Sequence, residues 1–287
     1  MSMDNAHHPT DSNARCAVYI AAMLDVKQKI DLLTRDLRFL LQNMSVDPVE
    51  SVHGIRKHTK FIRALLGLGS DKDSGLAAPI KRISKILAPF RDAQVNLETY
   101  QSLILRDAGF KAPELFAVLN GAEYLGRVHP DRQQLDEMAQ LTLQFQADWV
   151  QIGRQLDRES IHEKLVNSYT KCYDQSQVIS INSGTEVFHA WRKKVKKLWY
   201  RIRFIADDIE QTPEHVQTQL DGLGKSLGEI HDLDVLGEIA QGLGHQEWLA
   251  TLKTFRQELA DQAIQDARIT LGHGSAHFIN ILHELER

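Results

Sequence analysis

Cysteine is scarce in this chain: its 287 residues include only Cys16 and Cys172, and neither lies in a CxxC or Cys/His ligand spacing. A disulfide framework and a structural zinc site are therefore not expected, and a reducing cytoplasm is the expected compartment. No apolar run approaches the roughly 18 residues that cross a membrane. Residues 1–13 are polar, lack the pattern of a signal peptide, and are expected to form a disordered tail.

Strand signals are also missing. Aromatic residues make up 7% of the chain, and no alternating run of β-branched residues lies between turns. Apolar residues instead recur at helical spacing between Pro, Gly and Asx breaks. The expected helices span 14–43, 48–67, 74–87, 91–105, 114–125, 132–156, 161–179, 189–204, 215–230, 236–244 and 247–286. The sequence predicts an all-α protein of two four-helix bundles, residues 14–158 and 159–287.

The most informative segment lies at 188–204. From His189 to Arg203 it carries seven Lys/Arg, no acid, and no Gly or Pro. On a helix of about 100° per residue, the basic residues and Tyr200 gather on one face and Trp191 and Trp199 lie toward the other. The apolar side should face a core, and it consists of Trp191, Val195, Leu198, Ile202 and Ile205, as Ile55, Ile62 and Leu66 form the apolar side of segment 53–66. This leaves mutually repelling cations on the opposite side and suggests an anionic ligand.

A second copy of this pattern indicates an internal duplication. Residues 53–63 repeat the His, Arg, Lys and Lys of 189–196 at equal offsets, and residues 85–95 share Lys, Leu, Asp and Val with residues 225–235. The two motifs are separated by 39 residues in the first half (His53 to Asp92) and by 43 in the second (His189 to Asp232).

Positive charge is concentrated in a few of these segments. Residues 53–63, 79–91 and 189–203 hold 15 of the 34 Lys/Arg and none of the 38 Asp/Glu, although the net charge is −4. Such concentration in an otherwise acidic chain favours a focused anion site over general adhesiveness.

The motif HxxRKxxKxLxY, which begins at His189, resembles the signature of the CHAD family, the conserved histidine α-helical domain. LGEIHDLDV at 227–235 is similar to the second element of that family, and degenerate copies begin at His53 and Lys85. The resemblance implies two pseudo-symmetric four-helix bundles whose basic helices face a central cavity or pore. It also implies binding of inorganic polyphosphate, with location at cytoplasmic polyphosphate granules and contact with other granule proteins.

A linear polyanion needs a row of cations, and Lys and Arg supply point charges and forked donors to phosphoryl oxygens. The predicted polyphosphate-binding residues are His53, Arg56, Lys57, Lys60, Arg63, Lys81, Arg82, Lys85, Arg91, His189, Arg192, Lys193, Lys196, Lys197, Arg203, Lys225 and His231. Asp92, Asp232, Asp234 and Tyr200 are expected to give structural support. No catalytic residue, metal or cofactor is expected, and neither a membrane nor a nucleic acid is the expected partner.

Three departures from the family pattern affect this interpretation. His231 replaces an Arg, Gln94 replaces an acid, and Gly54 lies inside the first basic helix. His231 raises the question of pH-dependent binding, because His changes charge near neutrality.

The alternatives are a metal-dependent phosphohydrolase, a nucleic-acid-binding helical protein and a metal-chelating His protein. Chain-length preference, a recruited partner, the oligomeric state and the role of the tail stay open.

Overall fold

A computed structural model describes residues 26–69, 75–107, 109–121, 130–152, 158–206, 214–274, 276 and 278–280. These ranges contain helices and no strand, which confirms the all-α prediction. The principal helices are α2 (Val26–Gln42), α3 (Pro48–Gly69), α4 (Ala78–Ile86), α5 (Ala88–Arg106), α6 (Pro113–Leu119), α8 (Arg132–Ile152), α9 (Arg158–Val178), α10 (Thr185–Ala206), α11 (Glu214–Gly242) and α12 (Gln246–Leu271). The tail predicted at 1–13 lies outside the described residues.

Local sequence signals explain several helix starts. At α3, the Asp47 carboxylate accepts a hydrogen bond of 3.1 Å from the Glu50 N–H, and Pro48 occupies the first turn, where a missing N–H costs nothing. At α8, Asp131 and Gln134 form a reciprocal capping box with bonds of 2.8 and 3.0 Å.

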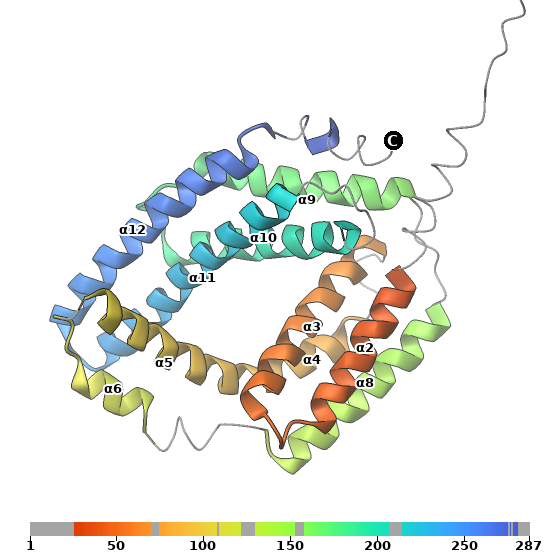
Figure 1. The fold of residues 1–287 in the computed structure, drawn as a ribbon, viewed down its shortest axis with the longest axis horizontal. Coiled ribbons are helices and arrows are strands. Elements are labelled where there is room, and N and C mark those ends of the chain that lie inside the picture. The colour runs from red at the N-terminus through yellow and green to blue at the C-terminus, as the bar shows by residue number, and fades with distance from the viewer. Residues whose placement is uncertain are drawn as a thin grey trace, which may run out of the picture.

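The helices pack in two groups that repeat one order of contacts (Figure 1). In the first group, α2 contacts α3 and α8, and α4 contacts α3 and α8. In the second, α9 contacts α10 and α12, and α11 contacts α10 and α12. In this order α3 takes the place of α10, and α4 the place of α11. The arrangement is what a duplication would produce, and the duplication and its boundary stay a prediction.

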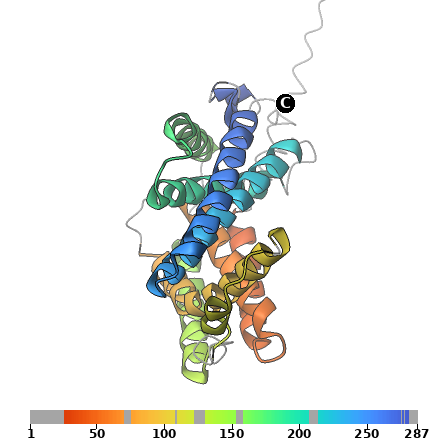
Figure 2. The same cartoon turned by 90° about the vertical axis from the view of Figure 1, so that its left-hand side faces the viewer.

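The two groups join through the basic helices. Helix α3 contacts α10 and α9, and α5 extends from the first group to contact α11. A hydrophobic cluster of buried side chains runs from α2 and α3 through α10 to α11 and α12. A second cluster packs α5 and α6 onto the end of α11 and the start of α12. Turning the molecule by 90° shows α12 running along one side, across both α5 and α11 (Figure 2).

Several predicted boundaries are wrong. The helix expected at 114–125 ends at Leu119. Residues 214–242 form one uninterrupted helix rather than two, because Leu233 and Leu236 continue the buried stripe of α11. The last long helix ends at Leu271 rather than continuing to Glu286. A Cβ on Gly272 would lie 2.0 Å from the Arg268 carbonyl oxygen, and Gly274 has a φ of +73° that favours glycine.

Candidate anion-binding site

The apolar stripes of α3 and α10 lie in the core, and cations of the two helices act electrostatically on one another. Trp191, Val195 and Leu198 of α10 are fully buried, as are Ile55 and Ile62 of α3. These predicted core positions are confirmed. The predicted stripe also included Ile205, whose side chain lies outside the described residues.

Cations from three helices converge around Lys60 of α3. Arg56 lies one turn earlier on α3, Arg192 and Lys196 come from α10, and Arg91 comes from α5. Burial, followed by repulsion from these four groups, lowers the pKa of Lys60 to about 8. The Lys60 side chain is nevertheless exposed to solvent.

Aspartates accompany the central arginines in both halves. Asp92 of α5 lies 3.7 Å from the Arg56 guanidinium. Asp232 of α11 lies within the fields of Arg192 and Arg91. The pKa of both carboxyls is raised, because burial outweighs the attraction of the arginines. These aspartates offset only part of the positive charge.

Helix α11 accommodates the long cations of α10 at two glycines. A Cβ on Gly224 would lie 2.8 Å from Lys196 Cε, and one on Gly228 would lie 3.6 Å from Arg192 Nε. Lys196 and Arg192 therefore lie against bare backbone one helical turn apart. Asp221 orients Lys196 with an ion pair of 3.4 Å.

Three histidines border the cations. His189 and His231 bring their rings to 4.4 Å between centroids, across the contact of α10 with α11. Burial, followed by repulsion from nearby cations, lowers the pKa of both. His53 of α3 is exposed, and burial and then Arg91 lower its pKa. These lowered pKa values favour uncharged imidazoles at pH 7.

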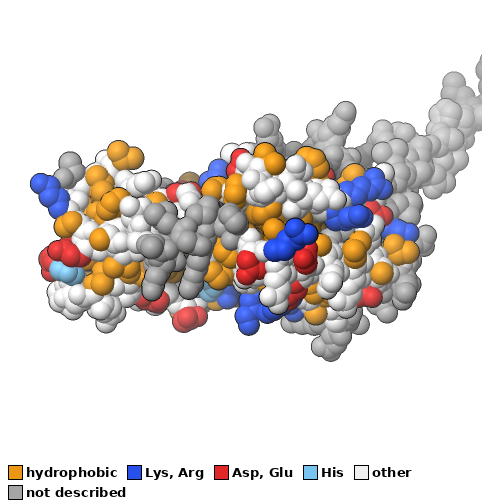
Figure 3. Space-filling model, turned by 90° about the horizontal axis from the view of Figure 1, so that it is seen from below, with side chains coloured by type: hydrophobic (Ala, Val, Ile, Leu, Met, Phe, Trp, Pro, Cys, Tyr) orange, Lys and Arg blue, Asp and Glu red, His pale blue; other side chains and the backbone are white. Residues whose placement is uncertain are grey.

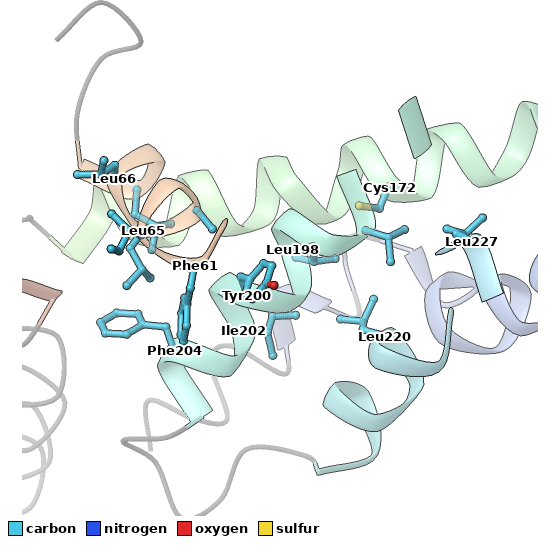
Figure 4. Close-up of a cluster of buried hydrophobic side chains, with 14 of the residues drawn as sticks. Phe61, Leu65, Leu66, Cys172, Leu198, Tyr200, Ile202, Phe204, Leu220 and Leu227 are labelled. Atoms are coloured by element: carbon cyan, nitrogen blue, oxygen red, sulfur yellow. The ribbon is translucent and has the colours of Figure 1, made fainter. Parts of the chain in front are cut away.

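The aromatic residues do not lie as the helical wheel predicts. Tyr200, expected on the basic face, is buried, and its ring lies 5.4 Å from that of Phe61. Figure 4 shows Phe61 of α3 between Tyr200 and Phe204 of α10. Trp199, expected on the apolar side, is half-buried, with Lys196 Nζ 4.9 Å and Arg203 Cζ 5.5 Å from its ring centre. The wheel fails because α3 covers one end of the basic face.

Several predicted cations pair with acidic side chains. Arg82 pairs with Glu137 of α8 at 2.7 Å, and Lys225 pairs with Asp221 at 2.8 Å. Arg91 both reaches the central cations and pairs with Glu98 at 3.3 Å. Lys197 lies near Gly67, at the C-terminal end of α3. Other predicted residues with exposed side chains are Lys57, Arg63, Lys81, Lys85 and Lys193.

The face in Figure 3 carries Lys/Arg and Asp/Glu side chains next to one another instead of a continuous basic surface. This mixture matches the ion pairs that occupy outlying cations.

Sequence reasoning missed Arg201. It is buried in the joint between the halves, and it donates to the carbonyls of Ala64 at 3.2 Å, Gly67 at 2.5 Å and Lys164 at 3.1 Å. It also donates to the Ser168 hydroxyl. Nothing in the pattern of charges separated this arginine from its neighbours.

Two other partners were also missed. Asp234, expected to support the site, pairs with Arg256 of α12 at 2.5 Å. Asp221 precedes Lys225 by four residues, and the i, i+4 rule would have found it.

The described residues contain no group of three or more His, Cys, Asp or Glu arranged to hold a metal ion. Among the helices that the structure describes, none is long and apolar enough to cross a membrane.

Comparison with known proteins supports the resemblance found in the sequence. Residues 31–241 match the family model of the CHAD domain. No curated protein and no solved structure matches. The matched residues run from within α2 nearly to the end of α11, so they include every helix that contributes to the convergence of cations. Because the match covers well over half of the chain, this protein belongs to the CHAD domain family.

Proposed function

We propose that this protein binds inorganic polyphosphate at the cations that α3, α5 and α10 bring together, and that it does so without chemical turnover. The observation that carries the proposal is the convergence of four further cations from three helices around Lys60, where burial and then repulsion from these cations lower the pKa of Lys60 to about 8. Membership of the CHAD domain family supports the same ligand.

The arrangement suits a linear polyanion better than a single phosphate. Arg56 and Lys60 lie one helical turn apart on α3, and Arg192 and Lys196 lie one turn apart on α10. Successive phosphoryl groups would meet alternating guanidinium and ammonium groups on both sides. Each bound phosphate would relieve the repulsion that now raises the energy of the charged cluster, so binding and the charge of Lys60 are coupled.

The test is a calorimetric titration of polyphosphate at several salt concentrations. Wild type should bind with an affinity that falls linearly in log salt, because several counterions are released. Arg192→Glu/Lys196→Glu should lose most of this affinity. Lys171→Glu/Lys253→Glu makes the same change in net charge at exposed positions of α9 and α12, and it should bind as wild type does.

Single-stranded RNA is the decisive competitor. The position of Trp199 beside Lys196 and Arg203 gives the nucleic-acid alternative an aromatic group for base stacking. Polyphosphate should displace labelled RNA, and RNA should not displace polyphosphate at equal phosphate concentration. Preferential binding of RNA would overturn the proposal, and so would equal binding of polyphosphate by the charge-reversed variant.

The absence of turnover needs a separate assay. Polyphosphate incubated with the protein and Mg²⁺ or Mn²⁺ should keep its length on a gel, whereas released phosphate would favour the alternative of a metal-dependent phosphohydrolase. We also propose that the protein resides at polyphosphate granules, which imaging of a fluorescent fusion with and without the Arg192/Lys196 charge reversal would test.

A further inference from the structure

Two imidazoles and one guanidinium meet where α10 contacts α11. The rings of His189 and His231 lie 4.4 Å apart between centroids and are inclined by 41°. Arg192 lies one turn after His189 on α10 and acts electrostatically on both rings. In the repeated motif, His231 occupies the position that Arg91 has in the first half. The second half thus places a titratable group where the first half has a permanent charge.

Three nitrogens of this cluster are buried and have no hydrogen-bond partner among the described residues: Nδ1 of His189, Nδ1 of His231 and Nε of Arg192. A buried polar atom without a partner costs about 1–3 kcal/mol. Three such atoms at the contact of α10 with α11 therefore point to a ligand that forms hydrogen bonds with them.

The charged surroundings keep both imidazoles neutral in the free protein. Burial, then Arg192 and His189, lower the pKa of His231 to about 4, and only Asp234 acts in the opposite direction before Lys193 lowers it further. Asp234 is already paired with Arg256 of α12. His189 has burial, Lys193 and Arg192 against it and Glu186 in its favour. The titratable groups on which Arg192 acts also include Arg56, Lys60, Lys196, Tyr200 and Asp232.

We propose that His189, His231 and Arg192 bind one phosphoryl group of the polyanion, and that the imidazole pair takes up one proton as this group binds. The inference rests on the proposed function. A phosphoryl oxygen supplies a negative charge beside the His189–His231 pair. It also accepts a hydrogen bond from the additional N–H that protonation of one imidazole creates. Only one proton is taken up, because two adjacent imidazolium ions would repel each other.

The sign of the linkage is fixed by this arrangement. The complex holds the proton more tightly than the free protein does. Affinity for polyphosphate therefore rises as the pH falls toward about 4, the pKa of His231 in the free protein. Full uptake of one proton corresponds to a roughly tenfold gain in affinity for each pH unit.

The experiment is calorimetry of polyphosphate binding between pH 8 and pH 6, in buffers of different ionisation enthalpy. Wild type should take up more protons than His231→Arg. Protons that bind to the ends of the polyphosphate contribute equally to both titrations, so they cancel in the difference between the two proteins. His231→Arg should bind at pH 8 at least as tightly as wild type binds at pH 6. His231→Gln should bind weakly at both, and His245→Gln, remote on the turn before α12, should match wild type.

Equal proton uptake by wild type and His231→Arg would overturn the inference and leave polyphosphate binding intact. Failure of wild type to bind polyphosphate at any pH would remove the proposed function and this inference together. The imidazole signals of His231, followed by NMR, give a second readout, because polyphosphate should move the titration of this ring to higher pH.

Discussion

The two basic helices are built alike but have different partners. In the first group of helices, Arg56 of α3 faces Asp92, and in the second group Arg192 of α10 lies close to Asp232, at positions that the predicted repeat makes equivalent. The helix that carries Asp92 is interrupted between Ile86 and Ala88, whereas the helix that carries Asp232 is continuous. The comparison shows that one Arg–Asp arrangement tolerates a broken and an unbroken supporting helix.

The chemistry at the next position differs more. Arg91 is permanently charged and divides its interactions between the cluster and Glu98. Its counterpart His231 is uncharged at neutral pH and pairs with another imidazole. The first half therefore contributes fixed charge, and the second half contributes charge that the ligand can induce.

The joint between the halves is also unequal. Arg201 follows His189 by 12 residues, and the residue 12 positions after His53 is the fully buried Leu65. A guanidinium in α10 thus binds the carbonyls at the end of α3, whereas the equivalent side chain of α3 packs in the core.

Making the halves alike at this joint should have the largest effect on stability. Arg201→Leu gives α10 the residue that α3 has, but it leaves the carbonyls of Ala64, Gly67 and Lys164 without their shared donor. We expect a loss of about 2–4 kcal/mol in the free energy of unfolding, measured with urea. Lys194→Leu, also on α10, removes one hydrogen bond of 2.8 Å to Gln175 of α9 and should cost much less. Equal stability of Arg201→Leu and wild type would show that the joint does not depend on Arg201.

A smaller effect, on polyphosphate affinity, should follow from adding a side chain at Gly224, where Lys196 lies against bare backbone of α11. Gly224→Ala places a methyl group 2.8 Å from Lys196 Cε and 2.9 Å from Nζ, so the ammonium must shift and its ion pair with Asp221 should weaken. We expect roughly threefold weaker polyphosphate binding. Gly222→Ala on the same helix meets nothing within 4 Å, and it should leave the affinity unchanged. Both substitutions favour the helix by about 0.5–1 kcal/mol, so a difference in affinity cannot come from propensity. Identical affinities of Gly224→Ala and Gly222→Ala would show that Lys196 does not depend on the glycine at position 224.

Much of the arrangement could be predicted from the sequence. Helical spacing identified the apolar stripes of α3 and α10, and the buried Trp191, Val195 and Ile62 confirm it. The family resemblance implied that the two basic helices would face each other, and in the structure Arg192 acts electrostatically on Arg56. The binding site to which both were assigned stays a prediction.

What failed depended on contacts between distant segments. A helical wheel treats α10 as an isolated cylinder. It therefore predicted that Tyr200, which α3 covers, would be exposed and that Trp199, which is half-buried, would lie toward the core. The same method cannot foresee that Arg201 enters a joint with α3 and α9 instead of facing an anion. The departure at Gly54 has a packing explanation, because a Cβ there would lie 2.8 Å from Leu40 of α2.

The central claim is that the cations of both halves form one site. The most direct test is the stoichiometry and affinity for a polyphosphate of defined length, measured for wild type, Arg56→Glu/Lys60→Glu, Arg192→Glu/Lys196→Glu and the quadruple variant, with circular dichroism to verify folding. A single shared site predicts one chain bound per protein, a loss of more than about tenfold in each double variant, and little further loss in the quadruple variant. Two chains bound to wild type, or wild-type affinity in the α3 variant, would contradict a site shared by the two halves.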